Sequence, residues 1–137
     1  MIIGYTSGVF DLFHIGHLNL LKKAKENCDY LIVAVSTDEL VKEYKNKTPV
    51  ISFEERKSIV EAIRYVDKVI PQTNRDKIST YNSLKFDVMI VGDDWKDSEI
   101  FSQVEKHMKK HGGWVKYVPY TNTTSSTFLR QKLNEEE

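Results

Sequence analysis

Several features are scarce in this sequence, and each scarcity excludes a class of protein. The 137 residues include a single cysteine, Cys28, so no disulfide can form within the chain and a cysteine-rich metal site is excluded. The longest apolar run, residues 31–35, is far too short to span a bilayer. Lysine and arginine total 20, as do aspartate and glutamate. The chain therefore lacks the basic excess typical of a general binder of nucleic acid or anionic membranes.

Export signals and disordered compositions are also missing. Residues 1–6 contain no basic region before a long apolar stretch, so they do not resemble a signal peptide. Hydrophobic residues make up 40% of the chain and charged residues 29%, which is typical of a globular protein. There is no internal repeat, and 137 residues leave no room for a second ordinary core. We expect one soluble domain over residues 1–137, located in the cytoplasm.

Short apolar runs alternate with amphipathic stretches along the whole chain. The apolar runs predict five strands, at residues 2–6, 30–36, 68–70, 87–91 and 114–118. Helices are expected between them, at residues 15–25, from Ser52 to Val66, at 75–85, at 98–111 and from Ser126. This alternation predicts an α/β domain with a parallel sheet covered by helices on both faces. Such open sheets bind ligands beyond the carboxyl ends of the strands.

Two segments between these elements carry local signals. Ser52 and Glu55 have the spacing of a capping box, in which the serine and the glutamate satisfy free amides at a helix start. The basic segment at residues 42–47 follows the second strand and is expected to be a charged loop. Pro71 is expected to end the third strand.

After the first strand, residues 8–17 place two histidines around a glycine where a helix opens. Free amides and the positive end of the helix dipole favour an anion at such a position. Donation from His14 and His17 would stabilise a polyphosphate, and more strongly the charge that develops in a transition state. A second interpretation is that His14 caps the helix and His17 is a half-buried surface residue. A zinc site is disfavoured, since the spacing is short and no third ligand is near.

Two later loops also follow strands. Carboxylates and an indole at residues 92–95 can hydrogen-bond to a base and stack on it, although the same residues suit a turn with Trp95 in the core. Residues 120–127 are rich in hydroxyls and precede the last helix. They could cradle phosphate together with the helix amides, or serve as an ordinary helix cap.

The segment 8–17 resembles the G-x-F-D-x-x-H-x-G-H signature of the nucleotidyltransferase superfamily, in its cytidylyltransferase branch. Residues 36–39, 55–57, 64–67 and 92–95 resemble successive blocks of bacterial glycerol-3-phosphate cytidylyltransferases, in order and over essentially the whole chain. The resemblance implies a Rossmann-like, doubly wound sheet of order 3-2-1-4-5. It also implies an enzyme that joins CTP to an alcohol phosphate, glycerol-3-phosphate being favoured, and releases CDP-glycerol and pyrophosphate.

The resemblance further implies a set of site residues. The catalytic residues that the resemblance implies are His14, His17, Lys45, Lys47 and Arg64. Lys45, Lys47 and Arg64 would also bind the acceptor, and a small length difference leaves open which lysine contacts phosphate. Its nucleotide-binding residues are Thr6, Ser7, Gly8, Val9, Phe10, Asp11, Gly16, Gly92, Asp93, Asp94, Trp95, Thr121, Ser125 and Ser126. Mg²⁺ would be bound mainly through the phosphates, with Asp11 near it. A homodimer that supplies precursors of a cell-surface polymer would also be in keeping with the family.

One loop departs from the family pattern R-T-E-G-I-S-T-[ST]. Thr121, Ser125 and Ser126 match it, but Tyr120 stands where the family has a phosphate-facing arginine, and residues 122–123 also differ. Either another cation substitutes, with Arg130 the nearest candidate, or the acceptor or its pose differs. The alternatives are another alcohol phosphate with CTP, an ATP-dependent adenylyltransferase acting on FMN or a sugar phosphate, and a nucleotide-binding module without catalysis. A fragment of a class I tRNA synthetase is disfavoured by the short chain and the absence of a basic excess.

Overall fold

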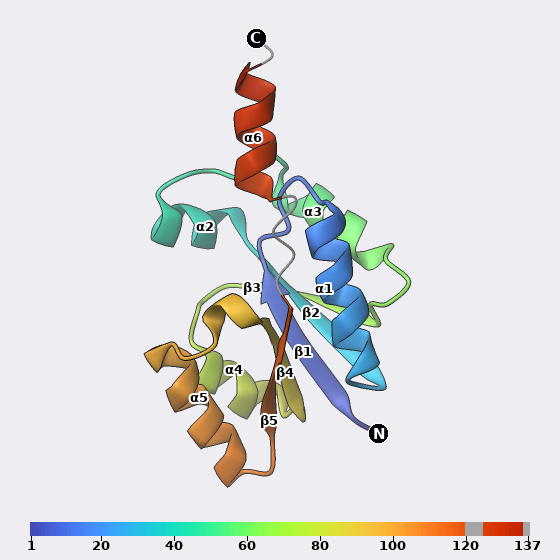
Figure 1. Ribbon diagram of the computed structural model, residues 1–137, viewed down its shortest axis with the longest axis vertical. Coiled ribbons are helices and arrows are strands. Elements are labelled where there is room, and N and C mark those ends of the chain that lie inside the picture. Colours follow the sequence, from blue (N-terminus) through green and yellow to red (C-terminus); the bar gives the residue numbers. More distant parts are fainter. Residues whose placement is uncertain (120–124, 136–137) are drawn as a thin grey trace.

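Five parallel strands form one sheet in the order β3-β2-β1-β4-β5, which confirms the predicted topology. The structure is a computed structural model that describes residues 1–119 and 125–135. Its elements, shown in Figure 1, are β1 (Ile3–Gly8), α1 (Ile15–Glu26), β2 (Tyr30–Ser36), α2 (Asp38–Lys45), α3 (Phe53–Glu61), β3 (Lys68–Gln72), α4 (Lys77–Leu84), β4 (Val88–Gly92), the 3-10 helix η1 (Asp93–Trp95), α5 (Glu99–Lys110), β5 (Trp114–Val118) and α6 (Ser126–Glu135).

The core consists of two apolar layers, one on each face of the sheet. Successive side chains of a strand point to opposite faces, so β2 contributes to both layers. Leu31, Val33 and Val35 pack with Leu21 of α1 and Val60 of α3. On the other face, Ile32 and Ala34 of β2 join a layer that α4 and α5 cover, with Tyr81, Phe101, Val104 and Met108. Burial on both faces explains why β2 is apolar without alternation.

Three strands have bounds that differ from those expected. β1 runs to Gly8 and β4 to Gly92, two residues and one residue further than predicted. The prediction that Pro71 ends the third strand was wrong, because β3 continues to Gln72. β3 is the outermost strand on its side of the sheet. A proline is tolerated in an edge strand, since one side of that strand has no ladder bonds to lose.

The segment after β2 is helical rather than a charged loop, so that expectation was wrong. Thr37 caps α2 by accepting a hydrogen bond from the amide of Leu40, and Asp38 and Glu39 complement the positive end of the helix. Leu40 and Val41 are buried. Lys45 therefore ends a helix, and Asn46 follows it in the left-handed conformation that closes such ends.

The expected capping box at Ser52 is not formed. Ser52 occupies the N-cap position, but its side chain makes no cap hydrogen bond. The carboxylate of Asp38, from α2, instead accepts from the amide of Phe53. The helix also ends at Glu61, earlier than predicted, and the following residues turn towards β3 while Ile63 and Val66 still pack on the core. Helical spacing of apolar residues therefore persisted beyond the helix itself.

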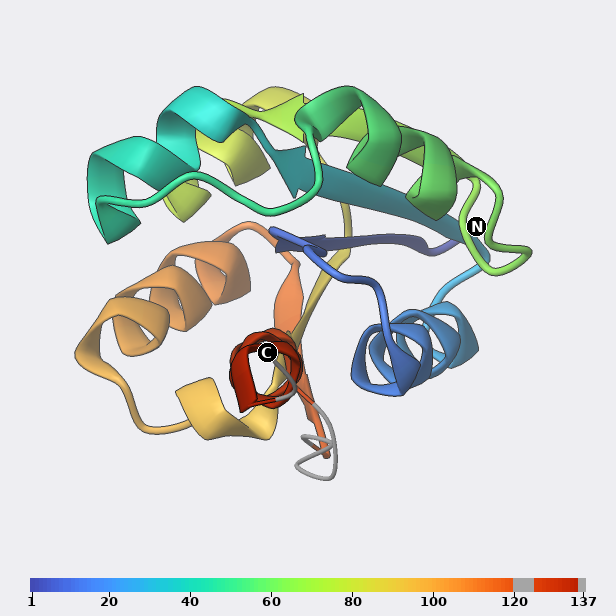
Figure 2. The same ribbon diagram turned by 90° about the horizontal axis from the view of Figure 1, so that it is seen from above.

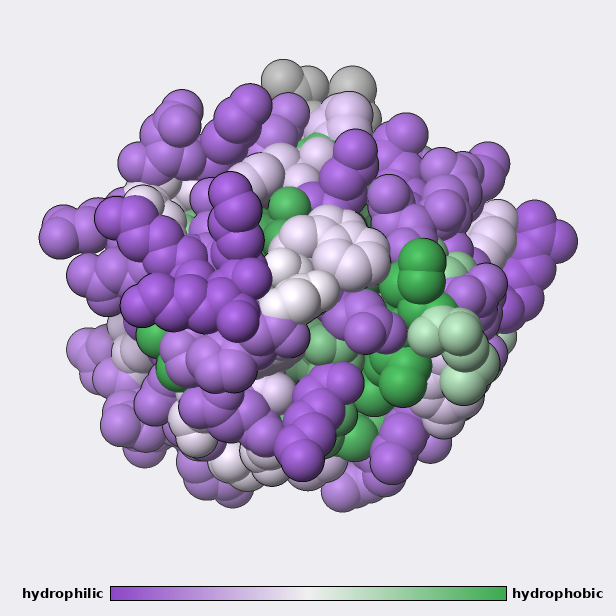
Figure 3. All heavy atoms as spheres, turned by 90° about the horizontal axis from the view of Figure 1, so that it is seen from below, coloured by the Kyte–Doolittle hydropathy of each residue, from purple (hydrophilic) through white to green (hydrophobic). Residues whose placement is uncertain are grey.

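The ends of the sheet differ in what covers them. Figure 1 shows α2 and α6 at the carboxyl ends of the strands, with α6 extending away from the rest of the chain. In Figure 2, α6 is seen almost end-on, between α5 and α1. Figure 3 views the opposite end, where the surface is mostly hydrophilic around a small apolar area. In the part of the chain that the structure describes, every helix is too short or too polar to cross a membrane.

Candidate functional site

The loop between β1 and α1 has an unusual backbone. Phe10 and Leu12 both have positive φ angles, 56° and 50°, which bulky residues seldom adopt. Strain of this kind persists where surrounding contacts impose it, and it is frequent at functional sites. A Cβ on Gly8 would lie 3.1 Å from the ring of Phe10, so the glycine allows this buried ring to pack against the strand end.

The two histidines cap α1 with their Nδ1 atoms. Nδ1 of His14 accepts a hydrogen bond from the amide of Gly16 at 3.0 Å. Nδ1 of His17 accepts from the amide of His14 at 3.2 Å, which completes a reciprocal capping box. The rings stack with centroids 3.9 Å apart. Because each Nδ1 accepts, each neutral ring carries its hydrogen on Nε2 and presents that atom as a donor. The capping interpretation and the donor interpretation are therefore compatible.

Both imidazoles are held in the neutral form. Burial lowers the pKa of His14 below its usual value. Burial, and then the neighbouring His14 ring, lower the pKa of His17 to about 3, against a smaller opposing effect of Asp11. At neutral pH the rings are therefore hydrogen-bond donors without net charge, so the positive charge of the site must come from other side chains.

Asp11 joins three segments of the chain. Its side chain is buried, and four donors surround its carboxylate. They are the backbone amides of Leu12, Val50 and Ile51 and the guanidinium of Arg130 on α6. This set satisfies the acceptor capacity of both oxygens, so Asp11 anchors the loop before α3 and the last helix.

Arg56, like Asp11, joins separate segments of the chain. It is fully buried at 0% exposure, and its guanidinium donates to the carbonyls of Val9, Ser36 and Ile51. It also pairs with Asp38 at 2.6 Å. The loops that follow β1 and β2 are thus tied to the start of α3 by one buried side chain. The sequence analysis did not identify Arg56 as a site residue. The available signal was that Arg56 lies in the block 55–57, which resembles the family.

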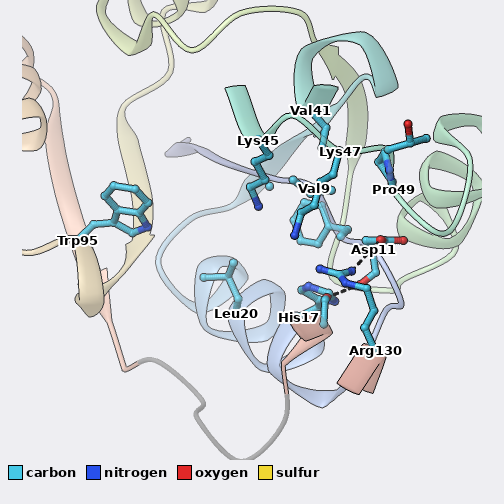
Figure 4. A pocket seen from close by; sticks show the side chains of 14 residues that line it. Val9, Asp11, His17, Leu20, Val41, Lys45, Lys47, Pro49, Trp95 and Arg130 are labelled. Carbon is cyan, nitrogen blue, oxygen red and sulfur yellow. Dashed lines mark hydrogen bonds and ion pairs between the residues drawn. The ribbon is translucent and has the colours of Figure 1, made fainter. Parts of the chain in front are cut away.

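Two adjoining cavities, of about 700 and 360 Å³, lie at the carboxyl ends of the strands. They share His17, Lys45, Lys47, Trp95 and Arg130 in their walls. In Figure 4, His17, Asp11 and Arg130 gather on one side, Lys45 and Lys47 approach from α2 and the residues after it, and Trp95 stands across the space. The volume of the larger cavity is typical of small-ligand sites.

The structure brings most of the predicted residues to these walls. Those lining one or both cavities are Thr6, Ser7, Gly8, Val9, Phe10, Asp11, His14, Gly16, His17, Lys45, Lys47, Gly92, Asp94, Trp95, Ser125 and Ser126. Asp93 does not line them, and Thr121 lies outside the described residues. Thr6 is buried, and its hydroxyl donates to the carbonyl of Ile90, so its side chain fastens β1 to β4.

Arg64 is not brought to the cavities. It follows α3 near the amino end of β3, is fully exposed, and its guanidinium contacts the hydroxyl and ring of Tyr65. Since α3 runs back along the sheet, its far end lies opposite the carboxyl ends of the strands. The position of Arg64 in this chain does not support the predicted contact with the acceptor phosphate.

Two cations after β3 were missed. Lys77, the first residue of α4, donates to Ser7 Oγ at 2.7 Å and lines the larger cavity. Burial, and then Arg75, lower the pKa of Lys77 to about 8. Arg75 lies over the ring of Tyr44, 4.3 Å from its centroid. The available signal was that both cations lie between the end of a strand and the start of the next helix, at the same end of the sheet as the histidines.

The residues after β4 form an exposed wall. Trp95 is 43% exposed and its ring centroid lies 5.7 Å from that of Phe101, so it is not a core residue. Asp94 lines the larger cavity beside it. An exposed indole next to a carboxylate offers a stacking face and a hydrogen-bond acceptor to an aromatic ring with amino groups.

The start of α6 lies against the β1–α1 loop. Ser125 Oγ accepts from the amide of Phe128, as a helix cap does. Ser126 Oγ donates its single hydrogen to the carbonyl of Asp11. The expectation that both hydroxyls hold phosphate is therefore modified, because Ser126 attaches the helix to the β1–α1 loop in this structure.

The described residues do not build a cage for a divalent cation. Among residues 1–119 and 125–135, no three histidine, cysteine, aspartate or glutamate side chains converge to hold a metal ion. The four donors around Asp11 leave its carboxylate without a free lone pair for Mg²⁺. A Mg²⁺ site made of protein ligands, with Asp11 among them, does not fit this arrangement.

Comparisons with known proteins agree with the geometry. The chain is 40% identical over 129 residues to the glycerol-3-phosphate cytidylyltransferase of Bacillus subtilis (strain 168), covering 93% of this chain and 94% of that protein. It is 39% identical to the one of Staphylococcus aureus (strain NCTC 8325 / PS 47), covering 93% and 92%. The crystal structure of the lipopolysaccharide core biosynthesis protein from Thermoplasma volcanium GSS1 superposes with a TM-score of 0.72 and 29% identity, over 90% of this chain and 99% of that one.

The family assignment rests on nearly the full length of the chain. The sequence matches the model of the cytidylyltransferase-like family over residues 5–132, which includes most of β1, His14 and His17, and most of α6. The predicted resemblance is confirmed, and the chain belongs to the cytidylyltransferase-like family.

Proposed function

We propose that this chain is a CTP-dependent cytidylyltransferase that transfers CMP to an alcohol phosphate, with glycerol-3-phosphate the favoured acceptor. The observation that carries the proposal is the pair of backbone-anchored imidazoles, which aim Nε2–H donors at a cavity containing lysines and arginines. Relatives that share about 40% of its residues are named for this activity with glycerol-3-phosphate. The products are CDP-glycerol and pyrophosphate.

The reaction needs positioning and charge stabilisation more than covalent chemistry. An oxygen of the acceptor phosphate forms a bond to the α-phosphorus of CTP, and the bond from that phosphorus to the bridging oxygen of the β-phosphate breaks. Pyrophosphate leaves with the electron pair, and no proton needs to be removed from an ionised acceptor phosphate. Holding the two polyanions in line supplies much of the rate enhancement.

The histidines are suited to the α-phosphate. Their rings are rigid, since each is fixed through Nδ1, and they lie where α1 begins, at the positive end of the helix dipole. Neutral donors that need no reorganisation can stabilise the charge gained by the non-bridging oxygens in the transition state. Lys45 and Lys47 lie beside them and compensate the charge of the two phosphate groups.

Two further regions of the cavity are assigned to the acceptor phosphate and to the cytosine base. In this proposal Lys77 and Arg75, which lie near Ser7 in the wall of the larger cavity, bind the acceptor phosphate together with Lys45 and Lys47. In this proposal Trp95, after β4, stacks on the cytosine ring, and Asp94 accepts a hydrogen bond from its amino group. Mg²⁺ is proposed to enter bound to the triphosphate, and chelation with EDTA should then abolish turnover.

The proposal includes the cellular setting. We propose a cytoplasmic homodimer whose product supplies a cell-surface polymer such as a teichoic acid or a capsule. Exposed apolar side chains, among them Trp114, Phe128 and Leu133, are available for contact with a second copy. Light scattering coupled to size exclusion should give a mass of about twice the 16.0 kDa chain, and a monomeric mass would contradict the dimer.

The activity is tested by measuring pyrophosphate release. CTP, ATP, GTP and UTP should each be combined with a panel of alcohol phosphates, sugar phosphates and FMN. We expect release with CTP and glycerol-3-phosphate to exceed every other pair. A preference for ATP would indicate an adenylyltransferase, and CTP binding without release from any acceptor would indicate a binding module.

A further inference from the structure

Three neighbouring strands, β1, β2 and β3, change from apolar to polar on one face where they reach the larger cavity. The apolar layer beneath α4 and α5 includes one residue from each strand, namely Tyr5, Ala34 and Ile70. Two positions later on the same strands come Ser7, Ser36 and Gln72, and alternation along a strand places them on the same face. All three line the larger cavity. The polar groups therefore lie at the carboxyl ends of the strands, where open sheets of this kind bind ligands.

The amide group of Gln72 is held in one orientation by β2. Ser36 Oγ donates a hydrogen bond to Gln72 Oε1 at 2.7 Å. Ser36 is buried, and Gln72 lies opposite it in the pairing of β2 with β3. Because the amide oxygen faces Ser36, the amide nitrogen and its two hydrogens lie on the other side of the group. Among the residues that the structure describes, no acceptor contacts this nitrogen, so a ligand in the cavity can accept from it.

The side chains around Gln72 carry positive charge. Lys77 and Arg75 follow Gln72 closely in the chain, Lys45 ends α2, and all three line the same cavity. Among the described residues in that wall, the one carboxylate is that of Asp94, which follows β4. Strands β2 and β1 separate β4 from β3 in the sheet. The part of the wall around Gln72 therefore attracts a phosphate and repels a cationic group.

These groups suit a phosphate that carries an uncharged, hydroxylated carbon chain. A hydroxyl oxygen has lone pairs that can accept a hydrogen bond from Gln72 Nε2. An ammonium group has three donors and no acceptor, so its hydrogens would face those of Gln72 and its charge would lie near Lys77 and Arg75. Placing like charges together is strongly unfavourable, and such repulsion is a common means of rejecting a wrong partner.

We propose that Gln72, oriented by Ser36, binds a hydroxyl group of the acceptor and makes this chain select polyol phosphates over amino-alcohol phosphates. The inference rests on the proposed function and deepens it by naming the residue that recognises the alcohol part of the acceptor. Lys77 and Arg75 bind the phosphate group, and Gln72 binds the carbon chain beside it. Ser36 is a positioning residue, because it acts through Gln72.

The test uses three small phosphate monoesters that differ in one group: 2-hydroxyethyl phosphate, 2-aminoethyl phosphate and ethyl phosphate. Each is combined with CTP, and the rate of pyrophosphate release gives kcat and KM. For the unchanged protein, kcat/KM with the hydroxyl compound should exceed that with ethyl phosphate by about 3–10-fold, the effect of one hydrogen bond between neutral groups. It should exceed that with the amino compound by about 100-fold, because charge repulsion is added.

Two variants separate binding from positioning. Gln72→Leu keeps a side chain of similar size without the amide, so kcat/KM with the hydroxyl compound should fall to about the value with ethyl phosphate, chiefly through KM. Ser36→Ala removes the donor that orients Gln72, so part of the preference for the hydroxyl compound should be lost. A merely structural role of Ser36 would instead lower kcat/KM for all three compounds by the same factor.

Gln103→Leu is the matched control. It removes the same amide from an exposed position of α5 that lines neither cavity. Its ratios of kcat/KM among the three compounds should equal those of the unchanged protein. Circular dichroism of each variant checks that a change in these ratios does not come from loss of the fold.

The outcomes distinguish this inference from the proposed function. Similar kcat/KM for the three compounds, or a higher value with the amino compound, would overturn the inference and leave CTP-dependent transfer standing. A preference for the hydroxyl compound that persists in Gln72→Leu would also overturn it.

Absence of turnover with every acceptor would overturn the proposed function. Saturation-transfer NMR with the same three monoesters then tests Gln72 by binding alone. Selective binding of the hydroxyl compound that is lost in Gln72→Leu would support the role of Gln72. Equal binding of all three compounds, or binding of none, would overturn the inference as well.

Discussion

The two sides of the cavity are built in different ways. On the side of His14 and His17, each functional group is fixed by hydrogen bonds to nearby backbone, and the buried anchors Asp11 and Arg56 are fully paired. On the side of α4, the functional groups are ends of long cationic side chains, such as Arg75 resting on Tyr44. The first arrangement provides rigid neutral donors for a reacting phosphorus, and the second provides charge that can adapt to a substrate.

The largest expected effect concerns the buried anchor of the rigid side. Arg56→Met should lower the free energy of unfolding by about 3–5 kcal/mol, because it leaves Asp38 and three carbonyls without their donor. Urea denaturation measures the change. Arg75→Met is the control from the adaptable side, and it should change stability by less than about 0.5 kcal/mol, since Arg75 is exposed. Similar losses of stability in both variants would contradict the difference between the two sides of the cavity.

The next effect concerns the donors themselves. His17→Ala should keep the fold but reduce turnover by about 10²–10³-fold, the usual cost of losing one preorganised donor. His17→Asn separates capping from catalysis, because its Oδ1 can still accept from the His14 amide. We expect His17→Asn to be as stable as the unchanged protein and as inactive as His17→Ala. His107→Ala, at a half-buried histidine of α5 that lines neither cavity, should be fully active. Unchanged turnover in His17→Ala would show that the histidine hypothesis is wrong.

The adaptable side should show a pH dependence that the rigid side lacks. The pKa of Lys77 is about 8, so its charged fraction decreases as pH rises through this value. Since kcat/KM reports ionisation of the free enzyme, kcat/KM for the acceptor should fall about tenfold per pH unit above this pKa. A guanidinium stays protonated throughout this range, so the variant Lys77→Arg should show no such fall between about pH 7 and 10.

The variant Lys77→Met measures how much Lys77 contributes to binding of the acceptor. It should raise the KM for the acceptor by about 10–100-fold while leaving the affinity for CMP unchanged. A flat pH profile of the unchanged protein, or an equal effect of Lys77→Met on CMP, would contradict the assignment of Lys77 to the acceptor.

The smallest effect is expected at Arg75. An exposed cation that interacts with a phosphate through solvent contributes about 1 kcal/mol or less. Arg75→Gln should therefore raise the KM for the acceptor by less than about fivefold, and added salt should reduce the difference further. Steady-state kinetics at low and high ionic strength provide the measurement. A larger increase in the KM for the acceptor would mean that the two sides of the cavity are more alike than the structure indicates.

The accuracy of the sequence predictions follows the range of the interactions involved. The strand at residues 30–36 and the strand at 114–118 were predicted with their observed bounds, because burial on a sheet leaves a continuous or alternating apolar pattern. The capping box at Ser52 was wrong, because Asp38 from another helix takes the amide that a local cap would satisfy. Lys77 was missed for a similar reason, since its place beside Ser7 depends on the packing of α4 against the sheet.

The sequence by itself determined the α/β alternation, the strand order implied by the family signature, and the segment that carries the two histidines. The alternation and the histidine segment depend on side-chain periodicity and on short motifs along the chain, whereas the strand order came from the resemblance to the family. Only the tertiary structure showed that Lys77 and Arg75 reach the cavity and that Arg64 does not. Charged side chains have no periodicity that reports their partners, and their placement depends on how distant helices pack around the carboxyl ends of the strands.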